Sequence, residues 1–206
     1  MNFLAHLYLS GNDSEIKIGN FIADSVKGKA HQNYSPKIQQ GILLHRKIDE
    51  FTDKHQITKE LSYLFKSNYK RHSGIVMDVF YDHFLCNNWG RYTDVPIHHY
   101  INQCYKILLK NFMILPTQVK TFLPIMIAKN RLLSYSKIEG IENALQLMAK
   151  YTSLPAESNF AMEVLNINYQ LINQQFLLFF DELILHVKNE LELYEFQQVN
   201  KLAENK

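Results

Sequence analysis

The apolar residues of this chain recur mostly three or four positions apart, the spacing that places side chains on one face of an α-helix. The clearest example begins at Ser35 and Pro36, a helix N-cap followed by proline at the first helical position. Two aliphatic side chains, an imidazole and a carboxylate then follow at steps of four, three and four residues: Ile38, Ile42, His45 and Asp49. The sequence therefore predicts a helix from residue 36 that carries polar chemistry on its inward face.

The same period predicts helices along the rest of the chain. The predicted ranges are about 57–69, 76–89, 96–112, 138–151 and 156–202. Pro116 is expected to separate two helices, and Pro124 to start, kink or interrupt one. The last range is expected to bend or divide near residues 166–168, and the final residues, LAENK, to fray.

These patterns predict an all-α fold of about seven to nine helices. No useful length of sequence alternates apolar and polar residues as strands do, and seven glycines and five prolines are too few for a β protein with many turns. At 206 residues the chain is long enough for one well-filled core. We therefore expect a single helical domain over residues 1–206.

The apolar runs, the first residues and the cysteines indicate where in the cell the protein is expected. The longest apolar runs, at 122–128 and 176–180, are far shorter than the roughly 20 residues of a membrane-spanning helix. The first residues lack the basic start and cleavage site of a signal peptide. We therefore expect a cytoplasmic protein without a membrane segment, in which Cys86 and Cys104 are reduced, packed thiols.

The charge is small but unevenly divided. The net charge is +2, and basic residues outnumber acidic ones in residues 1–130, whereas the reverse holds in residues 131–206. Such asymmetry permits an acidic partner on the first part, although scattered lysines more often form only a solvated surface. No dense basic stripe with interleaved aromatic residues is present, so we expect no nucleic-acid partner.

Three short segments place acids and imidazoles at helical spacing within apolar sequence: GNFIAD at 19–24, HRKID at 45–49 and DVFYDH at 78–83. With a histidine near the start of the chain, they supply eight candidate side chains: His6, Asn20, Asp24, His45, Asp49, Asp78, Asp82 and His83. Taken singly, each could be a helix cap, an ion-pair partner or a hydrogen-bonded core histidine. Together they favour a metal site, because several ionisable groups on inward faces are costly unless they are paired or bind a metal.

The donor types indicate which metal and which chemistry to expect. Carboxylates and imidazoles without thiolates favour Mn²⁺, Mg²⁺ or Fe²⁺ over a structural zinc site, and Mn²⁺ is the first expectation. The sequence lacks a serine-nucleophile motif, a Walker loop and a dinucleotide fingerprint. Metal-assisted hydrolysis of a phosphate ester is the remaining simple chemistry.

Four segments, in this order, resemble one known family: MNFLAHLYLS, GNFIADSVKG, GILLHRKIDEFTD and DVFYDHFL. Over residues 1 to about 90 the chain is similar to acyl carrier protein phosphodiesterase, a divergent branch of the His-Asp (HD) metal phosphohydrolases. The resemblance implies an HD-domain-like helical fold and a Mn²⁺-dependent enzyme. Such an enzyme cleaves the phosphodiester between the serine of holo acyl carrier protein and 4′-phosphopantetheine. No motif beyond about residue 95 adds to the resemblance.

The resemblance also implies roles for the candidate residues. The expected metal ligands are His6, Asp24, His45, Asp82 and His83. The expected catalytic carboxylates, which orient a ligand or act as general base, are Asp24, Asp49 and Asp78.

Substrate contacts are expected from Asn20, Arg46 and Lys27. Arg46 and its neighbour Lys47 could stabilise a phosphate, or they could lie on the solvent side of their helix. Lys27 and Lys29 flank a glycine and could contact an acidic carrier protein, or they could belong to a solvated loop.

Three functions remain open at this point. The first is hydrolysis of holo acyl carrier protein. The second is an HD-type phosphohydrolase that acts on a nucleotide or another small phosphodiester, since a metal cluster specifies reaction type better than substrate. The third is a helical module that binds a carrier protein without turnover, and the intact set of acids and imidazoles counts against it. The oligomeric state is left open.

Overall fold

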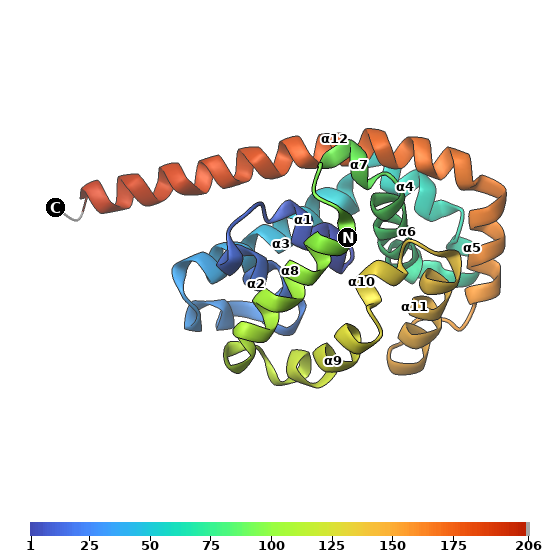
Figure 1. Cartoon of the computed structure of the whole chain (residues 1–206). Coiled ribbons are helices and arrows are strands. Elements are labelled where there is room, and N and C mark those ends of the chain that lie inside the picture. The colour runs from blue at the N-terminus through green and yellow to red at the C-terminus, as the bar shows by residue number, and fades with distance from the viewer. Residues whose placement is uncertain (205–206) are drawn as a thin grey trace.

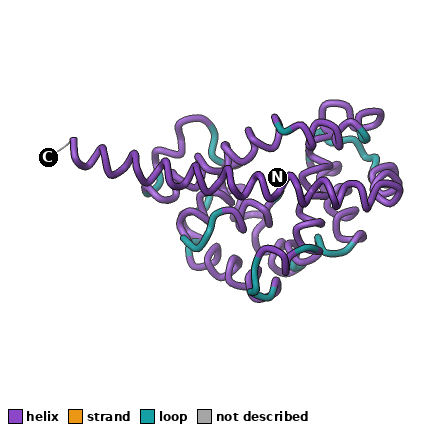
Figure 2. Tube along the Cα trace, turned by 90° about the horizontal axis from the view of Figure 1, so that it is seen from above, coloured by secondary structure: helices purple, strands orange, loops and turns teal. Residues whose placement is uncertain are grey.

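The regular structure of this protein is helical throughout residues 1–204, the part of the chain that the computed structural model describes, with side chains described through residue 194 (Figures 1 and 2). No strand occurs in that part, so the predicted all-α fold class is confirmed. The longer helices are α1 (Phe3–Leu9), α2 (Ser14–Ile22), α3 (Pro36–Lys54), α4 (Gln56–Tyr63), α6 (Ser73–Asn87), α8 (Ile97–Lys110), α9 (Thr117–Ala128), α11 (Ile138–Tyr151) and α12 (Ser158–Glu204). Short α-helices are α5 (Lys66–Tyr69), α7 (Trp89–Tyr92) and α10 (Arg131–Ser134), and 3₁₀ helices are η1 (Ala23–Ser25), η2 (Gly28–Asn33), η3 (Lys70–His72) and η4 (Phe112–Ile114).

The described residues form twelve α-helices, more than the seven to nine that the sequence predicts. Three of the twelve are short helices, and one of these arises where a predicted helix breaks. This is the range 57–69, because the chain turns at Leu64 and Phe65 and divides it into α4 and α5. After that turn the Phe65 ring is fully buried, with its centroid 5.4 Å from that of Phe80.

Several predicted helix boundaries are confirmed. Helix α3 begins at Pro36, and the Ser35 hydroxyl accepts a hydrogen bond from the backbone N–H of Ile38. Helix α11 has the predicted bounds. Pro116 is the N-cap of α9, whereas Pro124 lies inside α9 without ending it.

Helix α6 lies at the centre of the molecule. It is buried on all sides, as is typical of a helix surrounded by others, and α1, α4, α11 and α12 all pack against it. Its aromatic residues Phe80, Tyr81 and Phe84 are fully buried. Asp82 and His83 therefore lie within the core and not at its edge.

Helices α2 and α3 form the most extensive helix pair of the fold. They cross at two glycines, Gly19 and Gly41, where the backbones approach so closely that neither position has room for a Cβ atom. Asp13 caps the start of α2 by accepting hydrogen bonds from two backbone N–H groups. This crossing places the end of α2 beside the middle of α3, where the polar residues of both helices gather.

Helix α12 is the longest element and covers one side of the molecule (Figure 1). It turns in its first part and then runs along α3, α4 and α6 toward the C-terminal end, which projects beyond the other helices. It is one continuous helix, so the chain bends but does not divide. Residues 205–206 of the end expected to fray lie outside the described residues. No helix in the described part is long and apolar enough to cross a membrane.

Candidate metal centre

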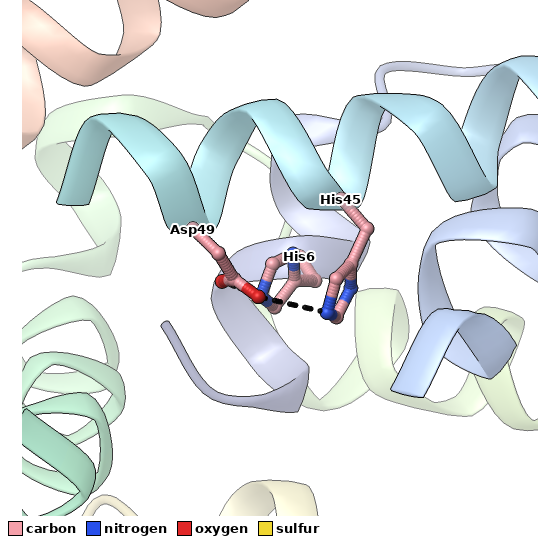
Figure 3. A group of neighbouring side chains, drawn as sticks. All are labelled: His6, His45 and Asp49. Atoms are coloured by element: carbon pink, nitrogen blue, oxygen red, sulfur yellow. Dashed lines mark ion pairs between the residues drawn. The ribbon is translucent and has the colours of Figure 1, made fainter. Parts of the chain in front are cut away.

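Two histidines and a carboxylate meet between α1 and α3 (Figure 3). One ligand atom from each of His6, His45 and Asp49 lies within 4.8 Å of the others. Asp49 Oδ1 is 3.2 Å from His6 Nε2, and Asp49 Oδ2 is 3.1 Å from His45 Nε2. The two imidazole rings are stacked, with centroids 3.9 Å apart. This His-His-Asp group could hold a divalent metal, since imidazole nitrogen and carboxylate oxygen are suitable ligands at such separations.

The local sequence explains how the three side chains meet. His45 and Asp49 are one turn apart on α3, so they share a face, as their spacing predicts. His6 comes from α1, which packs against α2 and α6. Both histidines are buried, whereas the Asp49 side chain is 38% exposed. The group is thus reached from the Asp49 side.

Asp24 lies at the open edge of the group. It belongs to the 3₁₀ helix η1 that follows α2, and its Oδ1 is 3.3 Å from His45 Nε2. Its side chain is 78% exposed, which makes it the most accessible carboxylate near the two imidazoles. The hydrogen bond from His45 lowers the pKa of Asp24, so this carboxylate is ionised at neutral pH.

Asn20 contacts the ring of His45 and the backbone of His6. Its backbone carbonyl accepts a hydrogen bond from His45 Nδ1 at 2.8 Å, and its side-chain oxygen lies 3.2 Å from the same nitrogen. Its amide donates to the His6 carbonyl at 3.0 Å and to the Ser10 hydroxyl at 2.9 Å. Because Nδ1 of His45 is engaged in this way, Nε2 is the nitrogen left for a metal or for a carboxylate.

The two imidazoles differ in charge when no metal is bound. Burial and the neighbouring charge of His45 lower the pKa of His6 to about 4, so that its imidazole is neutral. Burial also opposes the charge of His45, but hydrogen bonds with Asp24 and Asp49 outweigh it and raise the pKa to about 9. The bonds from both histidines hold the pKa of Asp49 well below its usual range despite its burial. A metal ion would replace the proton on His45 as the positive charge that this carboxylate faces.

Asp78 and Asp82 from α6 lie behind the group and have other partners. The Asp78 carboxylate is 2.9 Å from the α-amino nitrogen of Met1, which is also 3.4 Å from Asp49 Oδ1. The two oxygens of Asp82 accept hydrogen bonds from the backbone N–H groups of Leu4 and Ala5, at 2.8 and 3.0 Å. Asp82 therefore caps the helix that carries His6. Its burial raises its pKa to about 7 against the effect of those two hydrogen bonds.

His83 faces away from the His-His-Asp group. Its Nδ1 is 2.8 Å from the carbonyl oxygen of Tyr135, and its Nε2 is 2.9 Å from the hydroxyl of Tyr169. Both ring nitrogens are therefore engaged with residues from the second half of the chain. Adjacent helix positions point about 100° apart, which is why Asp82 and His83 reach different neighbours.

The basic residues near the group differ in their contacts. Arg46 donates hydrogen bonds to the carbonyl oxygens of Val26 and Gly28, at 3.2 and 3.0 Å, and so holds the segment after Asp24 against α3. Lys27, Lys29 and Lys47 are exposed.

Residues 1–183 match the family described as acyl carrier protein phosphodiesterase. The chain belongs to this family. The match extends well beyond the four segments that carried the resemblance and includes every candidate residue discussed above.

Curated relatives named acyl carrier protein phosphodiesterase align with most of the chain. One from Yersinia enterocolitica is 31% identical over 181 residues, which cover 87% of this chain and 94% of that protein. One from Photorhabdus laumondii is 32% identical over 155 residues, covering 73% and 76%. One from an Enterobacter strain is 28% identical over 194 residues, covering 92% and 99%. No solved structure matches the chain.

Three features of this site were not identified from the sequence. Ser10 and the α-amino group of Met1 have no spacing signal, because their contacts are tertiary. Gly41 had a signal that could have been used: a glycine in the middle of a strongly predicted helix indicates that another backbone approaches there.

Proposed function

We propose that this chain hydrolyses the phosphodiester that links 4′-phosphopantetheine to the serine of holo acyl carrier protein. The products are the apo carrier protein and free 4′-phosphopantetheine. Water adds to phosphorus, the bond from phosphorus to the serine oxygen breaks, and that oxygen leaves as the serine hydroxyl after taking up a proton.

The observation that carries this proposal is the placement of the His-His-Asp group beside an exposed carboxylate, in a chain that matches the family over residues 1–183. A phosphodiester needs positive charge near its oxygens and an oriented water molecule. His6, His45 and Asp49 are suited to hold the source of that charge, and Asp24 is suited to orient the water.

The donor set supports Mn²⁺ as the resident ion, with Mg²⁺ or Fe²⁺ as substitutes, because it contains nitrogen and oxygen ligands and no thiolate. Such an ion would polarise a phosphoryl oxygen and lower the pKa of a water molecule. Asp24 would accept a hydrogen bond from the attacking water, since it is ionised and exposed. Asn20 would act indirectly, by fixing His45 Nε2 toward the open edge.

The basic residues around Asp24 indicate where the carrier protein would bind. Arg46 donates hydrogen bonds to the carbonyl oxygens of Val26 and Gly28, so we assign it the positioning of the segment after Asp24. Lys27 and Lys29 stand exposed on that segment and are the residues placed to contact an acidic carrier surface. Contacts of this kind weaken as salt screens exposed charges.

The test uses purified protein, Mn²⁺ and holo carrier protein, with the mass of the carrier protein measured over time. We expect a loss of mass equal to the 4′-phosphopantetheine group. Asp24→Ala and His45→Ala should abolish this loss while leaving the far-ultraviolet circular dichroism of the fold in place. Asp94→Ala, which removes an exposed carboxylate on the loop before α8, is the matched control and should retain full activity.

Other outcomes distinguish the alternatives. Hydrolysis of a small phosphodiester without any change in the carrier protein would mean that the substrate is a small phosphodiester and not the carrier protein. Binding of the carrier protein without turnover under Mn²⁺, Mg²⁺ and Fe²⁺ would favour a non-catalytic binding module. Full activity of the Asp24 or His45 variant would remove that residue from the site.

A further inference from the structure

A cavity lies on the other side of α1 from the His-His-Asp group. It has a volume of about 440 Å³, within the range of about 300–1,000 Å³ that is typical of small-molecule sites. Its walls come from α1, α2, α7, α8 and α12. Tyr8, in its wall, follows His6 by two residues on α1, so their side chains point about 200° apart around the helix. The cavity is therefore separate from the candidate metal centre.

The cavity contains a buried ammonium group. Lys17 is only 5% exposed, its Nζ donates a hydrogen bond to the Gly11 carbonyl, and it lies 5.5 Å from the centre of the Tyr100 ring. Lys17 forms no ion pair within the part of the chain whose side chains are described. Burial lowers its pKa, as is expected for an ammonium that lacks a carboxylate partner. The carboxylate that most supports its charge, Asp13, is itself engaged by Lys37 and by the N-terminus of α2.

The other lining residues define the chemistry that would complement this ammonium. No acidic residue is among them, and a second lysine, Lys188, is exposed and lines the cavity from α12. The rest of the wall is mainly apolar and aromatic, for example Tyr8, Ile107 and Val187. A buried charge is stabilised by an opposite charge brought to it. A cavity with one buried ammonium and an apolar wall would therefore complement a ligand that carries one carboxylate on an apolar chain.

We propose that this cavity binds a medium-chain carboxylate, with the carboxylate group on Lys17 and the apolar chain along the aromatic and aliphatic wall. The lining favours a carboxylate over a phosphate ester, because it supplies only one buried cation and no arginine, whereas phosphate sites usually combine several donors. This inference is independent of the proposed hydrolysis, since it involves none of the residues that the reaction uses.

The protein contains its own reporter of such binding. Trp89 is the single tryptophan of the chain, and its ring centroid lies 5.4 Å from that of Tyr8 and 5.0 Å from that of Tyr100. Both tyrosines line the cavity. A ligand in the cavity should therefore alter the fluorescence of Trp89.

The experiment is a titration of the full chain with decanoate, below its micelle concentration, read by Trp89 fluorescence. We expect a saturable change, and binding at least tenfold weaker for decanol, which has the chain without the charge. Lys17→Met should lose decanoate binding by at least tenfold, whereas Lys188→Met, which removes an exposed charge, should change it only a few fold. Ile107→Phe, which fills the cavity and keeps both lysines, should also weaken binding.

Three results would overturn the proposal. These are the absence of a saturable signal for decanoate up to millimolar concentration, equal binding of decanol, and undiminished binding by Lys17→Met. Since Lys17→Met exchanges a buried charge for an apolar side chain of similar length, it should fold, and circular dichroism would verify this. If it does not fold, Ile107→Phe alone decides, and undiminished binding by that variant counts against the cavity. The titration needs no metal and no turnover, so its outcome is separate from that of the proposed hydrolysis.

Discussion

Gly19 of α2 and Gly41 of α3 pack backbone against backbone. A Cβ atom on Gly19 would lie 2.1 Å from the Ile38 carbonyl oxygen and 2.9 Å from the Cα of Gly41. A Cβ atom on Gly41 would lie 2.2 Å from the carbonyl oxygen of Ile16. This contact lets the Asn20 carbonyl come within 2.8 Å of His45 Nδ1, so the close helix crossing and the orientation of the imidazole depend on each other.

The first prediction concerns this crossing. Gly19→Ala should lower the free energy of unfolding by about 1–3 kcal/mol, because the added methyl group meets backbone atoms that can yield only if α2 and α3 separate. It should also weaken metal binding, because Asn20 moves with α2. Urea denaturation and a Mn²⁺ titration measure the two effects.

Gly74→Ala is the matched control for that prediction. Gly74 lies in α6, and a Cβ atom there would meet no atom within 4 Å. Its stability should be unchanged or higher by up to about 1 kcal/mol, since alanine loses less backbone freedom on folding. Equal destabilisation by the two substitutions would mean that the close crossing is not the cause.

The second prediction concerns Asp82. Asp82→Ala would leave the buried N–H groups of Leu4 and Ala5 without acceptors, at a cost of about 1–3 kcal/mol. Because α1 carries His6, metal affinity should fall as well, although Asp82 does not contact that imidazole. Asp82→Asn keeps one acceptor oxygen and should lose less stability. If Asp82→Ala left stability unchanged, the capping role assigned to Asp82 would have to be withdrawn.

The third prediction is a pH dependence of the metal-free protein. Burial raises the pKa of Asp82 from 3.8 to about 7, so the folded state holds the proton more tightly than the unfolded state does. The stability that this proton contributes is complete below pH 3.8 and is lost as pH rises through 7. Wild-type stability relative to Asp82→Asn should therefore fall by about 1–4 kcal/mol between pH 4 and pH 8. Denaturation of both proteins with chelator present, at several pH values, measures the difference, and a constant difference would contradict the prediction.

The sequence predicted those parts of the structure that depend on local pattern. The Ser35 cap and the helix that follows it are examples, as is the shared face of His45 and Asp49, because one helix determines both. Spacing could not show which neighbour each side of α6 meets, because buried residues occur on every side of that helix. The different partners of Asp82 and His83 therefore became clear only from the packing.

The contribution of α1 to the site was also beyond the reach of periodicity. His6 is one imidazole in a short apolar helix, and only the packing of α1 against α2 and α6 brings it onto His45. Asp24 was predicted to share a helical face with Asn20, but it lies in the 3₁₀ helix after α2, where the chain turns and leaves the carboxylate exposed. Tertiary contact and the irregular ends of helices set these positions.

The last prediction separates the His-His-Asp group from the buried histidine of α6. A bound metal stabilises the folded state by about 2.7 kcal/mol at one hundred times its Kd, so Mn²⁺ should raise the melting temperature of the wild-type protein, and a chelator should reverse the rise. Asp49→Asn and His45→Gln should remove this response, because each deletes a donor of the group. His83→Gln should lower the melting temperature without metal, since it disturbs the hydrogen bonds with Tyr135 and Tyr169, but it should still respond to Mn²⁺ as the wild type does. Loss of the response in His83→Gln alone would instead place the metal at α6.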